Sequence, residues 1–582
     1  MRGGLRYRRL RRGLREVCVG TAAAVLASGT SALVLVGLRA QPPTVGSSTG
    51  AWITGYVQGV LDLGSFPLVS ALGRIPNTRS NLLFPLLTAE LGRATGAAPV
   101  LVGHLLAAGS LGLAALLFGR LWARGRDPVA GLLAAVAFLW PPAVATGFMI
   151  RPDTLAFSLV LACALLAVRL ARGGPWQAWL LAGLALGLTY HAREYMLAPA
   201  AGALLVGWGL DLHRRAPGSR GRSALGRLLA LLAGALSTAA LPLAMGFLPW
   251  NGLTTLLDYA RQSQTPTYRL RDLFYLPALL PVWLLGAGGL ALAIWRGPGP
   301  RRDAALVQAG LLLPFAAFLL SRQQSPQYYV FPEVVLLGGC VGWLDLLRGR
   351  WPRWGAAAAV MALGVAWSGP RAWALLDGTP ERYHPRMHQE AWPARGSEVA
   401  AVVDWAMART TARPLVVVSR YIENLGEIFI VRFRRPVISE RGEGWGDELG
   451  GLRRLHRGQE LCVLTVGGSQ HPAGPAPGCA VEDTLETPSL LATLYRCDPG
   501  GLADGGQREG LSCVDWNGAC QQRDWLEGGL EQLTRRARDL GPAFTAGAGP
   551  GLLPWGPEKN GGRASPPDEP RRAGAADPES QE

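Results

Sequence analysis

Long apolar stretches recur along the first part of the chain, up to about Leu375, and they constrain its fold more than any other feature. Each is about 20 residues long, the length that a helix needs to cross the hydrocarbon core of a bilayer. Lipid offers no partners for exposed backbone groups, so only helices and closed barrels can cross it. Strands of alternating polarity are absent from this part of the sequence. The pattern therefore predicts about eleven membrane-spanning helices. The expected spans are 17–38, 98–119, 128–150, 154–170, 175–190, 195–212, 225–248, 274–295, 304–321, 328–347 and 354–369.

The charged residues between these stretches predict the orientation of the bundle. The chain begins MRGGLRYRRLRRGLR, and basic segments next to membrane spans usually stay in the cytoplasm. Counted from there, every second loop is short and arginine-rich, whereas the intervening loops hold acids and histidines. We therefore expect a multi-pass protein of the cell inner membrane with a cytoplasmic N-terminus. The expected cytoplasmic loops read GRLWARGRD, RLARGG, LHRRAPGSRGR, WRGPGPRRD and LRGRWPRW.

The net charge of +16 is explained by this topology. Nearly all of the positive charge is arginine, and Lys559 is the only lysine. The arginines gather in loops at the ends of the expected spans, where membrane orientation accounts for them. We therefore expect contact with membrane lipids and no binding of nucleic acid.

The domain organisation follows from where the apolar pattern ends. A basic cytoplasmic N-terminus, 1–16, precedes the transmembrane domain, 17–370, whose first outer loop, 40–97, is long and includes short amphipathic stretches typical of interfacial helices. An extracytoplasmic α/β domain is expected over 371–500. The tail, 501–582, is rich in glycine, proline and charge and is predicted to be largely disordered, with one candidate helix over 511–540.

Within 371–500 the pattern changes to that of a small α/β fold. EVAAVVDWAMART reads as an amphipathic helix, RYIENLGEIFIVRF as a candidate second one, and PLVVVS, RPVIS and ELCVLTVG as strands. Five of the eight cysteines lie at or beyond Cys462, which suits an oxidising compartment. Their pairing stays open. The predicted fold class is thus an α-helical polytopic membrane protein with a small C-terminal α/β extracytoplasmic domain.

Ionisable residues are costly near a membrane, so the expected outer loops are the place to look for a functional site. Asp62 lies in the first outer loop, where it is either a solvated helix residue or a catalytic carboxylate. In RPD, Asp153 begins the next expected span. It either caps the free amides of that helix or lies at the mouth of a cavity, with Arg151 beside it as an anion ligand.

Three later outer loops add further candidates. The loop LTYHAREYMLAP places His191, Arg193 and Glu194 in a tight turn between two spans, beside Tyr190. Arginines on the outer side run against the positive-inside tendency, and a phosphate group would explain them, because guanidinium binds phosphate bidentately. The remaining outer candidates are Arg261, Tyr268, Arg271 and Tyr328.

The stretches GYVQGVLDLGSFPL, RSNLLFPLLTAELGRATG, RPDTLAFSLVLACALLAVR, GLALGLTYHAREYMLAPAAG and SPQYYVFPEVVLLGG resemble the GT-C superfamily of membrane glycosyltransferases. The likeness is to the branch with protein mannosyltransferases and the enzymes that add aminoarabinose to lipid A. It covers about Val17 to Pro370 and rests on hydropathy and spacing more than on a sharp signature.

The resemblance implies transfer of a sugar from a polyprenyl-phosphate-linked donor to a lipid, glycan or protein acceptor on the periplasmic face. A carboxylate would act as general base on the acceptor hydroxyl. Asp153 is the first candidate for it, followed by Asp62 and Glu194. Arginines, or a divalent metal ion in some relatives, would stabilise the departing lipid phosphate. The expected substrate-binding residues are Arg151, His191, Arg193, Arg261, Tyr268, Arg271 and Tyr328.

One departure from the family pattern leaves alternatives open. The family usually has an acidic pair shortly after the first span, but here that stretch reads VGSSTGAWITGYVQG and contains no acid. Either the base has moved to another position or the protein is a non-catalytic GT-C-fold relative that acts in envelope glycan assembly. A membrane transporter is a further alternative, although its charges would usually lie near the bilayer midplane. A polysaccharide ligase or polymerase would carry a large outer loop late in the bundle, which this sequence lacks.

Overall fold

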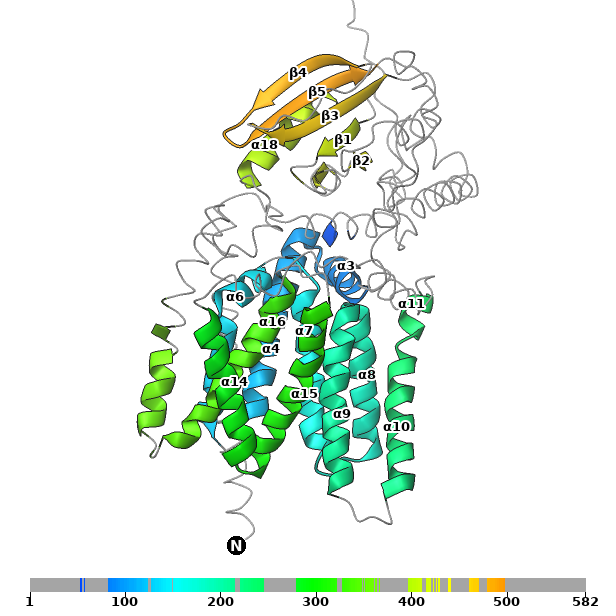
Figure 1. Ribbon diagram of the computed structural model, residues 1–582. Coiled ribbons are helices and arrows are strands. Elements are labelled where there is room, and N and C mark those ends of the chain that lie inside the picture. Colours follow the sequence, from blue (N-terminus) through cyan, green and yellow to red (C-terminus); the bar gives the residue numbers. More distant parts are fainter. Residues whose placement is uncertain are drawn as a thin grey trace, which may run out of the picture.

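The chain folds as a bundle of long helices with a small β-sheet beyond one end, as seen in a computed structural model (Figure 1). The structure describes residues 53–54, 57, 82–123, 127–148, 150–214, 220–244, 279–321, 327–347, 349, 351–360, 362–363, 366, 396–410, 415–419, 422, 425, 428–429, 438–440, 460–469 and 479–497.

The structure describes the following helices of the bundle, in chain order. They are α3 (Leu83–Thr95), α4 (Pro99–Ala123), α5 (Pro128–Val136), η2 (Ala137–Leu139), α6 (Pro141–Phe148), α7 (Asp153–Leu170), α8 (Trp176–Ala192), η3 (Glu194–Met196), α9 (Leu197–His213), α10 (Arg220–Ser237), α11 (Ala240–Ala244), α14 (Leu279–Arg296), α15 (Gly299–Ser321), α16 (Gln327–Gly338) and η5 (Gly339–Leu346), and a further helix covers 351–360.

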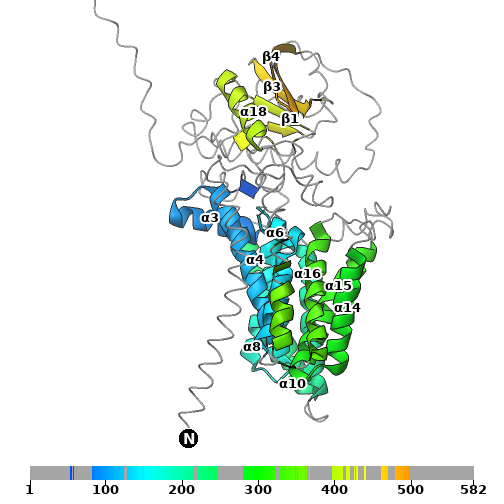
Figure 2. The same ribbon diagram turned by 90° about the vertical axis from the view of Figure 1, so that its left-hand side faces the viewer.

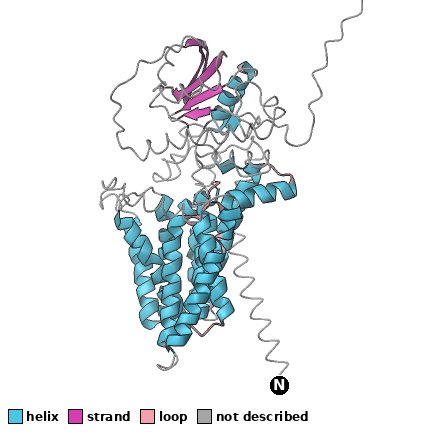
Figure 3. Cartoon of the chain, turned by 90° about the vertical axis from the view of Figure 1, so that its right-hand side faces the viewer, coloured by secondary structure: helices cyan, strands magenta, loops and turns pink. Residues whose placement is uncertain are grey.

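The bundle is a polytopic helical membrane fold. Among the described residues, four helical segments are long and apolar enough to cross a membrane: Pro99–Ala123, Asp153–Leu170, Glu194–His213 and Ala224–Leu243. The expected span 17–38 lies outside the described residues, so the number of eleven spans stays a prediction. Helix α3 lies across one end of the bundle (Figures 2 and 3), as expected of an interfacial helix in the first outer loop.

The expected span 128–150 is not one continuous helix. It consists of α5, one turn of 3-10 helix and α6, and the backbone at Trp140 is extended, with φ −53° and ψ 125°. Pro141 explains the break, because the residue before a proline is pushed out of the α conformation.

Close packing of small and aromatic side chains holds the bundle together. A Cβ atom on Gly183 of α8 would lie 1.9 Å from the carbonyl oxygen of Leu231 on α10, so only glycine lets these helices approach so closely. The rings of Phe157 on α7 and Phe331 on α16 stack with centroids 4.3 Å apart. Buried Gln308 on α15 accepts a 2.7 Å hydrogen bond from Trp122 on α4 and donates one to α16, which satisfies a polar group inside the bundle.

The arginine-rich loops meet at the end of the bundle opposite α3. There Asp127 caps α5, accepting hydrogen bonds from two backbone amides through Oδ1, while its Oδ2 lies 2.9 Å from Nη2 of Arg301 and 3.0 Å from Nη1 of Arg353. Arg301 also pairs with Asp345. This network joins α5, α15, η5 and the helix over 351–360, so the arginines expected to set orientation also connect the helix ends.

The sheet beyond the α3 end contains five strands in the order β2-β1-β3-β5-β4. β1 pairs in parallel with β2 and β3, whereas β5 pairs antiparallel with β3 and β4. The element bounds are α18 (Gly396–Arg409), β1 (Leu415–Ser419), β2 (Ile438–Glu440), β3 (Leu461–Gly468), β4 (Ala480–Glu486) and β5 (Leu490–Cys497). The first expected helix and the three expected strands overlap α18, β1, β2 and β3, whereas the candidate second helix, 420–433, lies mostly outside the described residues. β4 and β5 form a hairpin that the sequence analysis did not predict.

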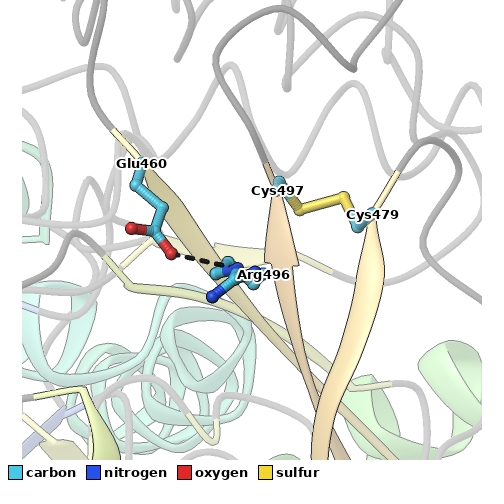
Figure 4. Close-up of a disulfide and its surroundings, with 4 residues drawn as sticks. All are labelled: Glu460, Cys479, Arg496 and Cys497. Carbon is cyan, nitrogen blue, oxygen red and sulfur yellow. Dashed lines mark ion pairs between the residues drawn. A yellow bond between two sulfur atoms is a disulfide. The ribbon is translucent and has the colours of Figure 1, made fainter.

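Two contacts fasten this hairpin. Glu398 on α18 accepts hydrogen bonds from the side chain of Thr487 and from both the amide and the hydroxyl of Ser489, in the turn between β4 and β5. A disulfide joins Cys479 to Cys497 across the open end of the hairpin (Figure 4). Cys462 is buried and is not part of this disulfide, and Cys513 and Cys520 lie outside the described residues.

Candidate functional site

A buried arginine–aspartate pair begins helix α7. Arg151 and Asp153 flank Pro152, and each is only 1% exposed. Nε of Arg151 donates a 3.0 Å hydrogen bond to Oδ2 of Asp153. Pro152 is the N-cap residue of α7, and no side chain caps this helix end. The Asp153 carboxylate is therefore engaged by a side chain and does not serve as the N-cap.

A second arginine reaches the same carboxylate from the turn between α8 and α9. Nε of Arg193 lies 3.3 Å from Oδ1 of Asp153, and the hydroxyl of Tyr195 donates a 2.5 Å hydrogen bond to that oxygen. The Arg193 guanidinium also lies 5.4 Å from the centre of the Tyr195 ring. We call Arg151, Asp153, Arg193 and Tyr195 the carboxylate cluster.

The carboxylate cluster holds two positive charges against one negative charge. Asp153 contacts a guanidinium through each of its oxygens, and this fixes the direction of both arginines. The side chain of Arg193 is 14% exposed and that of Arg151 only 1%. Arg193 is therefore the more exposed of the two arginines. Arg151 and Asp153 are buried, and Asp153 contacts both guanidinium groups.

His191 and Glu194 lie in the same turn but are not contacts of Asp153 in the described structure. The His191 imidazole is buried, hydrogen-bonds to the backbone of Thr238 and packs edge-on to Tyr190, with ring centroids 5.1 Å apart. It thus ties α8 to the segment between α10 and α11. The Glu194 side chain is 9% exposed and makes no hydrogen bond or ion pair with another described residue. The Glu194 carboxylate is therefore not engaged by any other described residue.

The cluster lies at the end of the bundle that carries α3 and α6 (Figure 1). Its parts come from two turns, one between α6 and α7 and one between α8 and α9, that the sequence analysis expected to face the same side of the membrane. Their meeting at one carboxylate agrees with that expectation.

The chain matches solved structures but no family model or curated sequence. No protein-family model matches the chain, and no curated protein matches its sequence. The crystal structure of ArnT from Cupriavidus metallidurans bound to undecaprenyl phosphate matches with a TM-score of 0.54 and 16% identity, over 81% of this chain and 98% of that chain. The apo structure of the same protein matches with a TM-score of 0.50 and 14% identity, over 81% of this chain and 97% of that chain.

The chain has the GT-C fold. The resemblance predicted from the sequence is thereby confirmed at the level of the fold. AglB from Archaeoglobus fulgidus gives a weaker match, with a TM-score of 0.47 and 12% identity over 77% of this chain and 69% of that chain.

The remaining predicted site residues of this GT-C fold are not placed with the cluster. Asp62, Arg261, Tyr268 and Arg271 lie outside the described residues, and Tyr328 lies in the first turn of α16, where its side chain is not described. Their roles stay predictions.

Two polar residues of the site region were missed by the sequence analysis. Tyr195 could have been found from its place two residues after Arg193 in a turn already marked as polar. Trp140, whose indole donates a 2.9 Å hydrogen bond to buried Glu333 on α16, gave no such signal, because 193 residues separate the two.

A divalent metal ion, which some GT-C relatives use, does not fit the described part of this site. Among the described residues, no three His, Cys, Asp or Glu side chains gather closely enough to hold a metal. Both oxygens of Asp153 face guanidinium groups, which would repel a cation.

Proposed function

We propose that this protein is a membrane glycosyltransferase that moves a sugar from a polyprenyl-phosphate-linked donor to a lipid, glycan or protein acceptor. One observation carries the proposal: in a chain with the GT-C fold, buried Asp153 holds two arginines at the end of the bundle where α3 lies. ArnT, which shares the fold, was crystallised with undecaprenyl phosphate. A fixed guanidinium is the group that best suits a lipid phosphate.

The proposed roles differ for the two carboxylates of the site. Asp153 was the first candidate for the base, but a carboxylate that contacts two guanidinium groups and a phenol hydroxyl is a weak proton acceptor. We therefore assign Asp153 to positioning Arg151 and Arg193. Glu194, with no partner among the described residues, is assigned as the general base. Asp62 is the alternative base.

The proposed reaction is a direct displacement at the anomeric carbon. Glu194 accepts the proton of the acceptor hydroxyl, whose oxygen forms a new bond to the anomeric carbon. The bond between that carbon and the donor phosphate oxygen breaks, and the electron pair leaves on the polyprenyl phosphate. Arg193, supported by Arg151 and Asp153, stabilises the charge that develops on the phosphate. His191 holds the turn in place, and Arg261, Tyr268, Arg271 and Tyr328 are proposed to complete the donor site.

The proposed location is the cell inner membrane, with the N-terminus in the cytoplasm and the sheet domain in the periplasm. The disulfide between Cys479 and Cys497 supports an oxidising compartment for the sheet. The network around Asp127 and Arg301, at the opposite end of the bundle, supports a cytoplasmic place for the arginine-rich loops.

The test is transfer of radiolabelled sugar from polyprenyl-phosphate donors by the purified full chain. We expect turnover by the wild type, loss of at least about a hundredfold in Glu194→Gln and a comparable loss in Arg193→Gln. Arg296→Gln removes one charge at the opposite end of the bundle, beside Trp295, and should retain activity. If Asp62→Asn is inactive and Glu194→Gln is active, the base is Asp62.

A non-catalytic relative is the second candidate, favoured by the absence of an acid in VGSSTGAWITGYVQG. It predicts that folded wild-type protein binds polyprenyl phosphate but turns over none of the donors. Failure to bind polyprenyl phosphate at all would reject both candidates and favour a transporter.

A further inference from the structure

A cavity at the other end of the bundle takes no part in the proposed reaction. Its volume is about 490 Å³, within the usual range for small-molecule sites. Residues from the ends of α7, α9 and α15 line it: Ala171, Arg172, Gly173, Asp211, Arg214, Gly299, Pro300 and Asp303. We call it the arginine pocket.

In the arginine pocket the positively charged side chains are exposed and the negatively charged ones are buried. Arg172 and Arg214 are 42% and 40% exposed, whereas Asp303, which both arginines contact, is only 4% exposed. The second lining carboxylate, Asp211, is also buried and pairs with Arg227. The more exposed charged groups of the pocket lining are therefore the guanidinium groups.

Both guanidinium groups are held in fixed positions. Nε and Nη2 of Arg172 lie 3.3 and 3.2 Å from one oxygen of Asp303. Arg214 contacts the other oxygen and donates a 2.8 Å hydrogen bond to the carbonyl of Ala171, at the end of α7. Each guanidinium has five N–H groups and uses two of them in these contacts. The others are available to an anion, with little loss of side-chain freedom on binding.

Two exposed tryptophans indicate that the pocket lies at the level of a membrane interface. Trp176 follows it at the start of α8, and Trp295 lies at the end of α14, just before the α15 residues that line the pocket; they are 60% and 76% exposed. Exposed tryptophans at helix ends are typical of the headgroup region. An anion at this level has two sources, the headgroup of a lipid or a soluble phosphate compound.

We propose that the arginine pocket binds a phosphate group through Arg172 and Arg214. The site is separate from the carboxylate cluster and faces the leaflet that the sequence analysis assigns to the cytoplasm. Asp303 positions the two arginines, as Asp153 does for its own pair, but here both guanidinium groups are more exposed than that of Arg193.

The test is lipid retention by the full chain in detergent, measured by native mass spectrometry with phosphatidylglycerol or phosphatidylcholine added. Phosphatidylglycerol, whose phosphate is not neutralised by a choline, should be retained more strongly. We expect Arg172→Ala and Arg214→Ala each to lower its retention about tenfold, since each removes charge-assisted hydrogen bonds. Arg302→Ala removes the same charge from an exposed residue next to Asp303 that does not line the pocket, and should retain the lipid as the wild type does.

Two further measurements are added to this test, one with inorganic phosphate and one with the variant Arg172→Lys. Inorganic phosphate is added at matched ionic strength: if it displaces phosphatidylglycerol or raises the unfolding temperature of the wild type but not of Arg172→Ala, the pocket accepts soluble phosphate as well. Arg172→Lys keeps the charge but loses the planar fork, and it should show an intermediate loss while remaining folded. Equal retention by the wild type, Arg172→Ala and Arg214→Ala, with no effect of inorganic phosphate, would overturn the proposal. So would a loss in Arg302→Ala as large as in the pocket variants.

Discussion

Tyr195 donates a 2.5 Å hydrogen bond to Oδ1 of Asp153, although 42 residues separate them in the chain. The contact joins the turn before α7 to the turn before α9, and it brings Arg193 to the same carboxylate. The candidate site of this GT-C fold is thus assembled around a negative charge that is itself inaccessible. Its arginines owe their positions to that buried charge.

Tyr195→Phe tests the contribution of this hydrogen bond. The ring is retained, but Asp153 loses one donor, and we expect a loss of about 1–2 kcal/mol in the free energy of unfolding. Sugar transfer should fall because Arg193 is less well oriented. Thermal unfolding and transfer assays measure the two effects. Tyr495→Phe, a buried tyrosine in β5 of the sheet, serves as the control and should leave transfer unchanged.

Asp153→Asn should be more damaging than Tyr195→Phe, because it removes the buried negative charge that contacts the guanidinium groups of both Arg151 and Arg193. Breaking a buried ion pair costs about 3–5 kcal/mol. The double variant Asp153→Asn with Arg151→Gln should recover part of this stability without recovering transfer. A double-mutant cycle on unfolding free energies measures the coupling. Additive effects would show that the pair is not coupled.

Glu194→Gln should abolish sugar transfer with little effect on the free energy of unfolding. The side chain makes no hydrogen bond or ion pair with another described residue, so the free energy of unfolding should change by less than about 0.5 kcal/mol. Transfer should nevertheless be lost, because the amide cannot accept the acceptor proton. Unchanged transfer in a folded Glu194→Gln protein would remove Glu194 from the proposed mechanism.

Arg301→Ala should destabilise the opposite end of the bundle. Its side chain is 4% exposed and contacts both Asp127 and Asp345, so two carboxylates lose a buried partner, at a cost of about 3–5 kcal/mol. Arg353 contacts the same two aspartates but is 26% exposed, and Arg353→Ala should cost clearly less. Unfolding temperatures in detergent compare the two variants. Equal losses would contradict the argument from burial.

Reduction of the disulfide between Cys479 and Cys497 should destabilise the sheet domain. Closing a loop between cysteines 18 residues apart stabilises a fold by about 3 kcal/mol in the chain-entropy model. The variant with both cysteines replaced by serine should therefore be cut by protease in the sheet domain at a lower temperature than the wild type. Cys462→Ser changes a buried thiol outside this disulfide and provides the comparison. Thiol labelling in intact cells would also show whether the pair is oxidised in place.

The helical spans could be predicted because their cause is local. An apolar stretch of about 20 residues is helical in lipid wherever it occurs, and α4, α7, α9 and α15 overlap the spans predicted for them. The break at Trp140 was not predicted. Pro141 restricts the backbone of the residue before it, but the apolar pattern of the whole stretch is that of one continuous helix.

The strands of the sheet up to β3 were also predicted. The hairpin of β4 and β5 was not, because β4 has an acidic, mostly exposed face that lacks a strand's apolar pattern.

The candidate site depended on both the sequence and the tertiary structure. By itself, the sequence determined that long apolar helices would form a membrane bundle, and it predicted that the loops with Arg151, Asp153 and Arg193 would share a side, because hydropathy and charge act residue by residue. Only the tertiary structure decided that Asp153 would be enclosed by Arg151, Arg193 and Tyr195, and that Glu194 would make no contact with another described residue. These contacts depend on how α7, α8 and α9 pack, and packing between helices far apart in the chain leaves no periodic signal in the sequence.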